Sequence, residues 1–459
     1  MTIFVEAQQK LADHDSLQIC GRVRAIAGIA LRVAGLERVA RIGQWCHVLT
    51  ADQRILGEVV ATDASGALLL PFGEWKGVAV GDPVQLLRTG SDIFPDESWI
   101  GSIVDALGRP LVPAQGFRKG SHACTTKAPP PKAFARRAVG AKLETRIKCV
   151  DLFTPVCRGQ RLGVFAGSGV GKSTLMAMLA RNTDADVIVI AMVGERGREV
   201  QEFVENDLGT DGMTRAVLVV STGDEPPLQR RQAAYTATAI AEYFRKKDKQ
   251  VLLLFDSVTR FAMAQREIGL ASGEPPTTKG YPPTVYSEMA QLLERAGPGI
   301  AGEGDITSLY TVLVDGDDFN EPISDAVRGI LDGHIVLDRA IAEQNRYPAV
   351  NVQKSISRML PDCHSREEYL IMAQARQALA RYNDMEDLIR VGAYRAGSDA
   401  DLDAAIKFFD AANGFLGQRK SETLPKDQTF ADIYRMLLDA GLPVDLGALS
   451  GEVVAEIGA

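Results

Sequence analysis

The segment that most constrains the fold is a glycine-rich loop, A-G-S-G-V-G-K-S-T at residues 166–174, which follows an apolar run and opens a helical stretch. Its glycines, Gly167, Gly169 and Gly171, let the backbone turn its N–H groups inward around a polyphosphate at a helix N-terminus. The general motif G-x-x-x-x-G-K-S/T begins with glycine, whereas this loop begins with Ala166. The loop therefore predicts a nucleotide site on an α/β fold.

The polar side chains of the loop have distinct expected roles. Lys172 is expected to reach the β and γ phosphates, and the Ser173 hydroxyl to ligate magnesium. The predicted nucleotide-binding residues are Gly167, Ser168, Gly169, Val170, Gly171, Lys172, Ser173 and Thr174.

Two carboxylates follow apolar runs that have the character of buried strands. Asp256 follows residues 251–255, and ligands sit at the carboxyl ends of such strands, so Asp256 is expected to hold magnesium directly or through water. Glu195 comes just after residues 187–193 and is the candidate to orient or deprotonate the attacking water. From spacing alone, a surface glutamate paired with a neighbouring arginine remains an alternative for Glu195.

Hydrophobic patterning divides the chain. From about residue 143 to 360, apolar runs alternate with helical stretches, which indicates a parallel sheet covered on both faces. The short strands and glycine turns before this region favour a small β-barrel, and the region after it is expected to be helical. The predicted division is an N-terminal helix at 1–15, a β-barrel at 16–95, a connector at 96–145, the nucleotide-binding core at 146–362 and a helical domain at 363–459.

Helix starts in the last region are expected from capping-box spacing. The pairs are Ser365 with Glu368, Ser398 with Asp401, and Thr429 with Asp432. At the other end of the chain, residues 2–13 can form a short helix with Phe4, Ala7 and Leu11 on one face. Both a frayed tail and a partner-docking segment fit that pattern.

Composition argues against several classes of protein. The net charge of -8 is not that of a protein with a broad basic surface for duplex DNA or anionic lipid. No run of about 18 apolar residues and no secretory signal is apparent, so a cytoplasmic protein is expected. The six cysteines form no C-x-x-C pair and are expected to be reduced thiols. The three tryptophans lie in the first 100 residues, where core and turn packing is favoured over base stacking.

A family resemblance adds to this reading. The segments VGERGREV, STGDEPPLQRR, LLLFDSVTRFA, KGYPPTVYSEMAQLLERAG and VDGDDFNEPISDAVRGILDGHIVLDR occur in an order similar to that of the ATP synthase α/β superfamily. The run PAVNVQKSIS at 348–357 matches the superfamily signature. Over nearly its whole length the chain resembles the flagellum-specific, or type III protein export, ATPases. The AGSGVGKS form of the loop is typical of that branch, so the Ala166 departure is expected there.

The resemblance implies a RecA-like P-loop NTPase core, an N-terminal barrel and a C-terminal helical domain, with ATP as substrate and magnesium as cofactor. It implies that Glu195 activates water and that Tyr347 stacks on the adenine. It also implies that Arg358 is an arginine finger inserted into a neighbouring subunit's site. From sequence alone, Arg358 also fits a salt-bridging role and Tyr347 a core aromatic.

The resemblance also implies partners. These are further copies in a homohexamer, a central stalk protein, a stator-like regulator at the N-terminus, and export chaperones and cargo at the C-terminal domain. The enzyme is expected at the cytoplasmic face of the inner membrane, peripherally at the export gate, without nucleic acid. The alternatives are a virulence-type secretion ATPase, a rotary ATP synthase catalytic subunit and an RNA-driven translocase similar to Rho. The acidic balance argues against the last.

Overall fold

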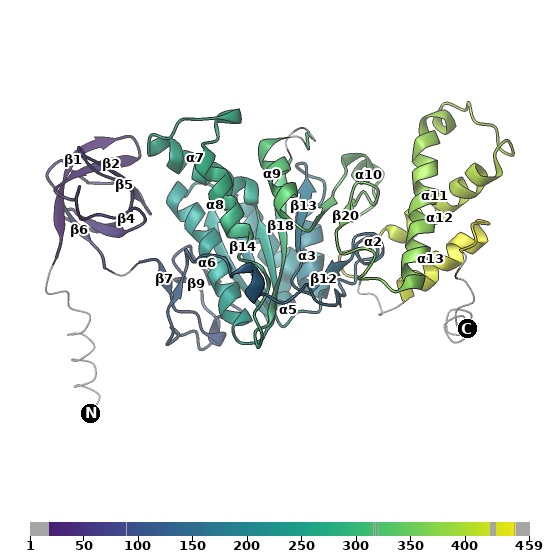
Figure 1. The fold of residues 1–459 in the computed structure, drawn as a ribbon, viewed down its shortest axis with the longest axis horizontal. Coiled ribbons are helices and arrows are strands. Elements are labelled where there is room, and N and C mark those ends of the chain that lie inside the picture. The colour runs from purple at the N-terminus through teal and green to yellow at the C-terminus, as the bar shows by residue number, and fades with distance from the viewer. Residues whose placement is uncertain are drawn as a thin grey trace.

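The computed structural model describes residues 18–88, 90–314, 316, 318–319, 321–422, 428–444 and 446. Three parts follow one another along the long axis of the molecule: a β-barrel, a central α/β unit and a helical region (Figure 1). This is the fold class that the sequence predicts. The helix expected at residues 2–13 lies outside the described residues.

The first part is a closed antiparallel barrel with the strand order β1-β2-β5-β4-β3-β6. Its strands are β1 (Cys20–Ala27), β2 (Ala30–Ala34), β3 (Trp45–Leu49), β4 (Arg54–Asp63), β5 (Gly66–Pro71) and β6 (Pro83–Leu86). The tryptophans serve packing, as expected: Trp45 contacts Phe72, Trp75 donates its indole N–H to the carbonyl of Ile29, and Trp99 is buried.

The central sheet has the order β20-β19-β13-β18-β16-β14-β15-β8-β9 in the described residues, with β17 paired to β18. Strands β19, β13, β18, β16, β14, β15 and β8 run parallel. The strands are β8 (Ile103–Val104), β9 (Pro110–Val112), β13 (Arg161–Ala166), β14 (Val187–Glu195), β15 (Ala216–Thr222), β16 (Gln250–Asp256), β17 (Gly297–Pro298), β18 (Asp305–Leu313), β19 (Gly333–Val336) and β20 (Ile356–Ser357). Every residue of β14 is buried, which is why its residues 187–193 form a continuous apolar run.

Helices cover both faces of this sheet. Side chains of α6, α7, α8 and α9 pack on one face, and those of α3 pack on the other together with residues from the C-terminal helices. The helices are α2 (Lys148–Phe153), α3 (Lys172–Asn182), α4 (Gly197–Glu202), α5 (Gly209–Met213), α6 (Pro227–Arg245), α7 (Val258–Ala271), α8 (Pro283–Leu293), α9 (Pro322–Ile330) and α10 (Arg339–Glu343), with a π-helical turn at Phe203–Leu208. Single 3-10 turns occur at Glu97–Trp99, Ala133–Ala135 and Thr278–Gly280.

The segment at 96–145, expected as a connector, also contributes to the core. Strands β8 and β9 extend the central sheet beyond β15. Two small ribbons, β7 (Asp92–Ile93) with β10 (Cys124–Thr125) and β11 (Lys142–Leu143) with β12 (Val156–Cys157), complete this part. Proline-rich stretches mark only a portion of the segment, so the strands on either side of them were not apparent from composition.

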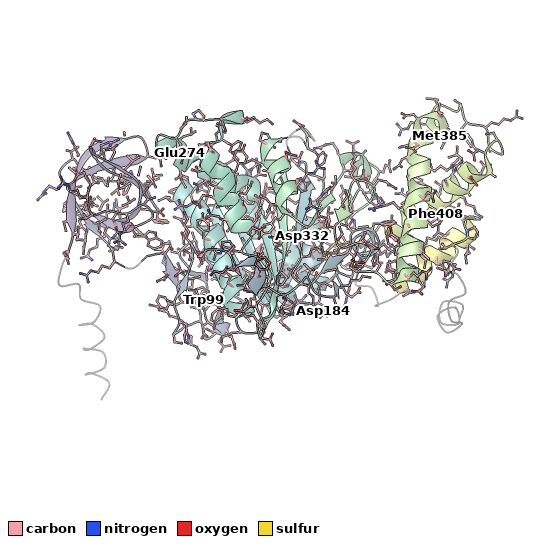
Figure 2. All side chains as sticks on the ribbon, viewed as in Figure 1. Trp99, Asp184, Glu274, Asp332, Met385 and Phe408 are labelled. Atoms are coloured by element: carbon pink, nitrogen blue, oxygen red, sulfur yellow. The ribbon has the colours of Figure 1, made fainter. Side chains whose placement is uncertain are left out.

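The C-terminal region consists of α11 (Arg366–Arg390), α12 (Ala400–Leu416) and α13 (Gln428–Asp439) in the described residues. Phe408 of α12 is completely buried there (Figure 2). The capping box of Ser365 with Glu368 is confirmed.

The other two predicted caps are wrong. Asp399 caps α12, because its carboxylate accepts the N–H groups of Asp401 and Leu402 while the Ser398 hydroxyl bonds to the carbonyl of Arg395. Thr429 lies inside α13. Among the described helices, none combines the length and the apolar character needed to cross a membrane.

Candidate active site

The glycine-rich loop leaves β13 and ends where α3 begins at Lys172. Gly171 is at φ +92°, and a Cβ added there would lie 3.1 Å from the ring of Tyr347. Glycine is required at this position both by the left-handed backbone and by the close approach of the ring. Ala166, in contrast, is the last residue of a regular strand and is buried, so a methyl group is tolerated. The departure from the general motif therefore leaves the shape of the loop intact.

Three predicted site residues converge beside this loop. The Lys172 ammonium lies 2.5 Å from an Asp256 carboxylate oxygen and 3.5 Å from a Glu195 carboxylate oxygen. Both carboxylates are buried, with Glu195 7% and Asp256 5% exposed. A lysine held between two buried carboxylates is a charged cluster protected from bulk water.

Strand order explains this convergence. Asp256 is the last residue of β16 and Glu195 the last residue of the neighbouring β14, so both side chains lie at the carboxyl edge of the sheet. The loop leaves β13 at the same edge, and one strand, β18, lies between β13 and β16. Parallel strands thus bring together residues that lie up to 84 positions apart in the sequence.

The electrostatics of the cluster favour proton transfer at Glu195. Burial raises the pKa of the Glu195 carboxyl; the Lys172 charge opposes this shift and the Asp256 charge adds to it. Burial disfavours the Lys172 ammonium, but the two carboxylates outweigh burial, so the pKa of Lys172 is raised. A carboxylate with a raised pKa is a stronger base than an exposed glutamate.

Two further residues of this edge were missed by the sequence analysis. Thr311 of β18 donates its hydroxyl to the Asp256 carboxylate at 2.6 Å, from the strand that separates β13 and β16. Arg260, on the first turn of α7, packs on Gly194 at φ +74°, and its charge lowers the pKa of Glu195. Its Nε is buried without a hydrogen-bond partner within the described chain. Thr311 belongs to none of the quoted segments, so only the strand order reveals it, whereas Arg260 lies within the segment LLLFDSVTRFA, which could have pointed to it.

Tyr347 lines a cavity of about 590 Å³ next to the loop. The other lining residues come from the start of α3, the loop after α10, the end of α12 and the loop after α12: Thr174, Asn345, Gly414, Gly417, Gln418, Arg419, Lys420 and Glu422. The backbone N–H of Gln418 donates to the carbonyl of Tyr347 at 2.7 Å. The Tyr347 ring is 37% exposed, so it has a free face for a flat ligand. The contribution of the C-terminal region was not foreseen.

The structure does not bring Arg358 to this cluster. Arg358 follows the edge strand β20, is exposed, and donates from Nη2 to the carbonyl of Arg328 at 3.3 Å. Its backbone N–H bonds to Asp332, which bonds in turn to Arg161 at the first residue of β13 (Asp332 is labelled in Figure 2). The glycine-rich loop follows the last residue of that strand, about 16 Å further along. Arg358 therefore lies at the opposite end of the sheet.

The donor set fits a magnesium ion. Ser173, on the first turn of α3, and Asp256 offer hydroxyl and carboxylate oxygens, the ligands that Mg²⁺ prefers. The described residues contain no group of three His, Cys, Asp or Glu side chains that could hold a metal alone. A cation here would complete its shell with phosphate oxygens and water, as Mg²⁺ does at nucleotide sites.

Comparison with known proteins gives matches to two families. Residues 146–357 match the ATP synthase alpha/beta family, nucleotide-binding domain, and residues 364–435 match the T3SS EscN ATPase C-terminal domain. The chain is 51% identical to the flagellum-specific ATP synthase of Caulobacter vibrioides, over 92% of this chain and 97% of that protein.

Two solved structures are similar over the same extent. The assembled ATPase EscN of the enteropathogenic E. coli type III secretion system has a TM-score of 0.85 and 38% identity, covering 91% of this chain and all of that chain. The same ATPase in complex with its central stalk EscO has a TM-score of 0.82 and 38% identity, with the same coverage of both chains.

Proposed function

The chain belongs to the ATP synthase alpha/beta family, and we propose that it is the ATP hydrolase of a flagellar type III protein export apparatus. Its activity is hydrolysis of ATP to ADP and phosphate, used to release or unfold flagellar subunits and their chaperones for export. The flagellar assignment rests on the 51% identity to the flagellum-specific relative of Caulobacter vibrioides, against 44% to the type 3 secretion system ATPase of Xanthomonas euvesicatoria. The export-type C-terminal match at 364–435 separates the chain from rotary synthases.

The observation that carries the ATPase assignment is the cluster of Lys172, Glu195 and Asp256 beside the glycine-rich loop. The loop N–H groups and Lys172 bind the phosphates. Glu195, buried and with a raised pKa, orients the attacking water and takes its proton. Arg260 supplies positive charge close to Glu195.

Ser173 and Asp256 would hold magnesium, which supplies charge neutralisation on the phosphate oxygens when bound. Thr311 fixes the Asp256 carboxylate through its hydrogen bond. Tyr347 stacks on the adenine in the cavity that the C-terminal region closes with Gln418. The adenine is therefore contacted by residues of both the nucleotide-binding core and the C-terminal region.

Arg358 acts in a neighbouring copy. It is exposed at the far end of the sheet from its own loop, so it serves a site on the next subunit of a ring. A ring of identical subunits repeats this contact at every interface. We propose a homohexamer, and a central stalk protein by analogy with the EscN complex with its stalk EscO.

The remaining partners are proposed from the family alone. The N-terminal segment binds a stator-like regulator, and the helical C-terminal region meets chaperones and cargo. The enzyme associates peripherally with the export gate at the cytoplasmic face of the inner membrane, and nucleic acid is not a partner.

The decisive experiment mixes two inactive variants. Glu195→Gln keeps Arg358 but lacks the base, and Arg358→Ala keeps the base but lacks the finger. In a ring mixed at equal amounts, roughly one site in four pairs an intact Glu195 with a neighbour's Arg358. The ATPase rate of the mixture is expected to recover to about a quarter of the wild-type rate, although each variant alone is inactive.

The matched control mixes Arg358→Ala with the double variant Glu195→Gln/Arg358→Ala, which restores no site. A mixture no more active than its components would overturn the shared site. Activity that needs single-stranded RNA would instead move the assignment to a translocase.

A further inference from the structure

The connector between the barrel and the nucleotide-binding core presents one aromatic side chain entirely to solvent. Phe134, in the 3-10 turn Ala133–Ala135, is 106% exposed, the largest value among the large hydrophobic side chains of the described residues. Every other phenylalanine in the described part of the chain is buried or half-buried. A single exposed hydrophobic side chain is ordinary on a protein surface, so the significance of this one depends on how it is held and where it lies.

The backbone around Phe134 is held firmly against the core. The Arg136 guanidinium donates to the carbonyl of Ala296 at 2.7 Å. The Arg137 guanidinium donates to the Asp305 carboxylate, also at 2.7 Å. Three consecutive prolines precede the turn and restrict its backbone further. An aromatic side chain on a backbone that is fixed in advance loses little conformational entropy when it binds a partner.

These contacts place the turn at the amino edge of the central sheet. Asp305 is the first residue of β18, and the neighbouring parallel strand β13 begins with Arg161. A cavity of about 390 Å³ lies at this edge, and its lining includes Ala133 of the turn together with Arg161 and Asp332 of the core. The glycine-rich loop leaves β13 at the opposite, carboxyl edge.

The surface beside Phe134 continues to Arg358. The backbone N–H of Arg358 donates to the carbonyl of Asp332 at 3.0 Å, and Asp332 lines the cavity next to the turn. Arg358 is exposed as well. Under the proposed function, Arg358 enters the nucleotide site of the next subunit. The amino edge that carries Arg358 and Phe134 therefore faces that subunit.

We propose that Phe134 anchors the interface between neighbouring copies of this chain, an inference that rests on the proposed ring of ATPase subunits. Phe134 packs against the carboxyl edge of the next subunit, the edge that also receives Arg358. Aromatic and arginine side chains dominate the binding energy of many interfaces, and here the ring supplies apolar contact area while the arginine supplies charge. Assembly of the ring and completion of the nucleotide site thus use one continuous surface.

The first test measures assembly of the full-length protein with Mg-ATP by analytical ultracentrifugation. Phe134→Ala is expected to raise the concentration at which half of the chains are assembled by at least roughly tenfold. Its thermal melt at low concentration is expected to match that of the wild type, because the side chain is fully exposed in the single chain. Phe134→Trp is expected to preserve assembly. The matched control is Val391→Ala, which shortens a 75% exposed side chain just past α11 and is expected to leave assembly unchanged.

The second test identifies what covers the side chain. Phe134 is replaced by photoreactive benzoylphenylalanine, and the assembled enzyme is illuminated. Covalent dimers are expected, with the linked peptides coming from the neighbour's segments that directly follow β14, β16 and β18 at the carboxyl edge. The same amino acid in place of Val391 is the control and is expected to give no dimers.

Normal assembly of Phe134→Ala, or the absence of dimers from position 134, would overturn the proposal. Cross-links that join position 134 of one copy to position 134 of another would also overturn it, because they mark a two-fold contact and not a ring contact. The mixture of Glu195→Gln with Arg358→Ala tests the proposed function separately. Recovered activity in that mixture, together with normal assembly of Phe134→Ala, would leave the shared site intact and remove Phe134 from the interface.

Discussion

At the carboxyl edge of the central sheet, Lys172, Glu195 and Asp256 lie buried against one another, whereas at the opposite end Arg358 is exposed at an edge strand. These three residues are held by the ends of two strands of the sheet and by the first residue of α3. The second depends on the C-terminal region, because Arg376 of α11 donates to the carbonyl of Val352 at 2.7 Å and to that of Ser355 at 2.9 Å.

Under the proposed function, this difference means that one chain completes only one half of the reaction centre. Binding phosphate and activating water need fixed, desolvated charges, which a parallel sheet provides. A finger that serves another subunit has to be exposed, and its position depends on what holds its segment. Arg376 also bonds through its carbonyl to Gln353, so helix and segment are joined at both groups. Hydrogen bonds therefore join the helical region to the segment that precedes Arg358.

The largest effect is expected at the buried edge. Glu195→Gln removes the base but keeps the size of the side chain, so kcat is expected to fall by about 10²- to 10⁴-fold while ATP binding persists. Steady-state ATPase rates and nucleotide titration measure the two quantities. The matched control is Glu202→Gln, an exposed glutamate two helical positions past Val200 that pairs with Arg198. A fall smaller than about tenfold would exclude Glu195 as the base.

A smaller loss of kcat is expected when the segment that carries Arg358 is loosened. Arg376→Ala frees the segment that carries Arg358, and a displacement of about 1 Å can lower kcat by up to roughly 10²-fold. A positioning role predicts a lower kcat with little change in KM, and partial rescue by Arg376→Lys. The control is Arg381→Ala on the same helix, whose partner Asp399 lies outside this segment. Equal losses of kcat in both variants would mean that the loss comes from a less stable helix α11 and not from the position of Arg358.

The proposed contact between Tyr347 and adenine lies where the nucleotide-binding core meets the helical region, and its loss is expected to have a weaker effect again. Tyr347→Ala removes the stacking ring, worth about 0.5–1.5 kcal/mol, so KM for ATP is expected to rise by roughly two- to tenfold. Tyr347→Phe keeps the ring and is expected to resemble the wild type. ATP titrations of both variants test this, and a large effect of the phenylalanine would point to the hydroxyl instead.

The smallest effect concerns the start of the helical region. Ser365→Ala is expected to lower the unfolding free energy of the helical region by about 1 kcal/mol, with the ATPase rate unchanged.

The same cap predicts a pH dependence of stability. Burial opposes ionisation of Glu368, but hydrogen bonds from His364 and the Ser365 N–H outweigh burial and lower the pKa of Glu368 to about 2. Because this pKa lies below the ordinary 4.5, the stabilisation is present above pH 4.5 and is lost as the pH falls toward 2. Thermal melts of wild type and Glu368→Gln over that range measure it, and identical slopes would contradict it.

Local patterns predicted the buried edge well. The loop 166–174 and the carboxylates that end two apolar strands were found because each of them directly follows or ends an apolar run in the sequence, which places it at a strand end. The parallel sheet, the barrel and the helical region followed from hydrophobic periodicity. The cap at Ser365 was also found from local spacing. The cap predicted at Ser398 was wrong because the next residue, Asp399, accepts the first N–H groups of α12 instead.

The sequence by itself therefore determined which residues lie in the glycine-rich loop and at the strand ends beside it, since these positions depend on glycine backbone freedom and on the ends of apolar runs. Only the tertiary structure decided which strand lies between β13 and β16, and hence that Thr311 holds Asp256. It also decided that Arg376 holds the segment before Arg358. These contacts join distant parts of the chain through strand order and helix packing, which no local spacing records.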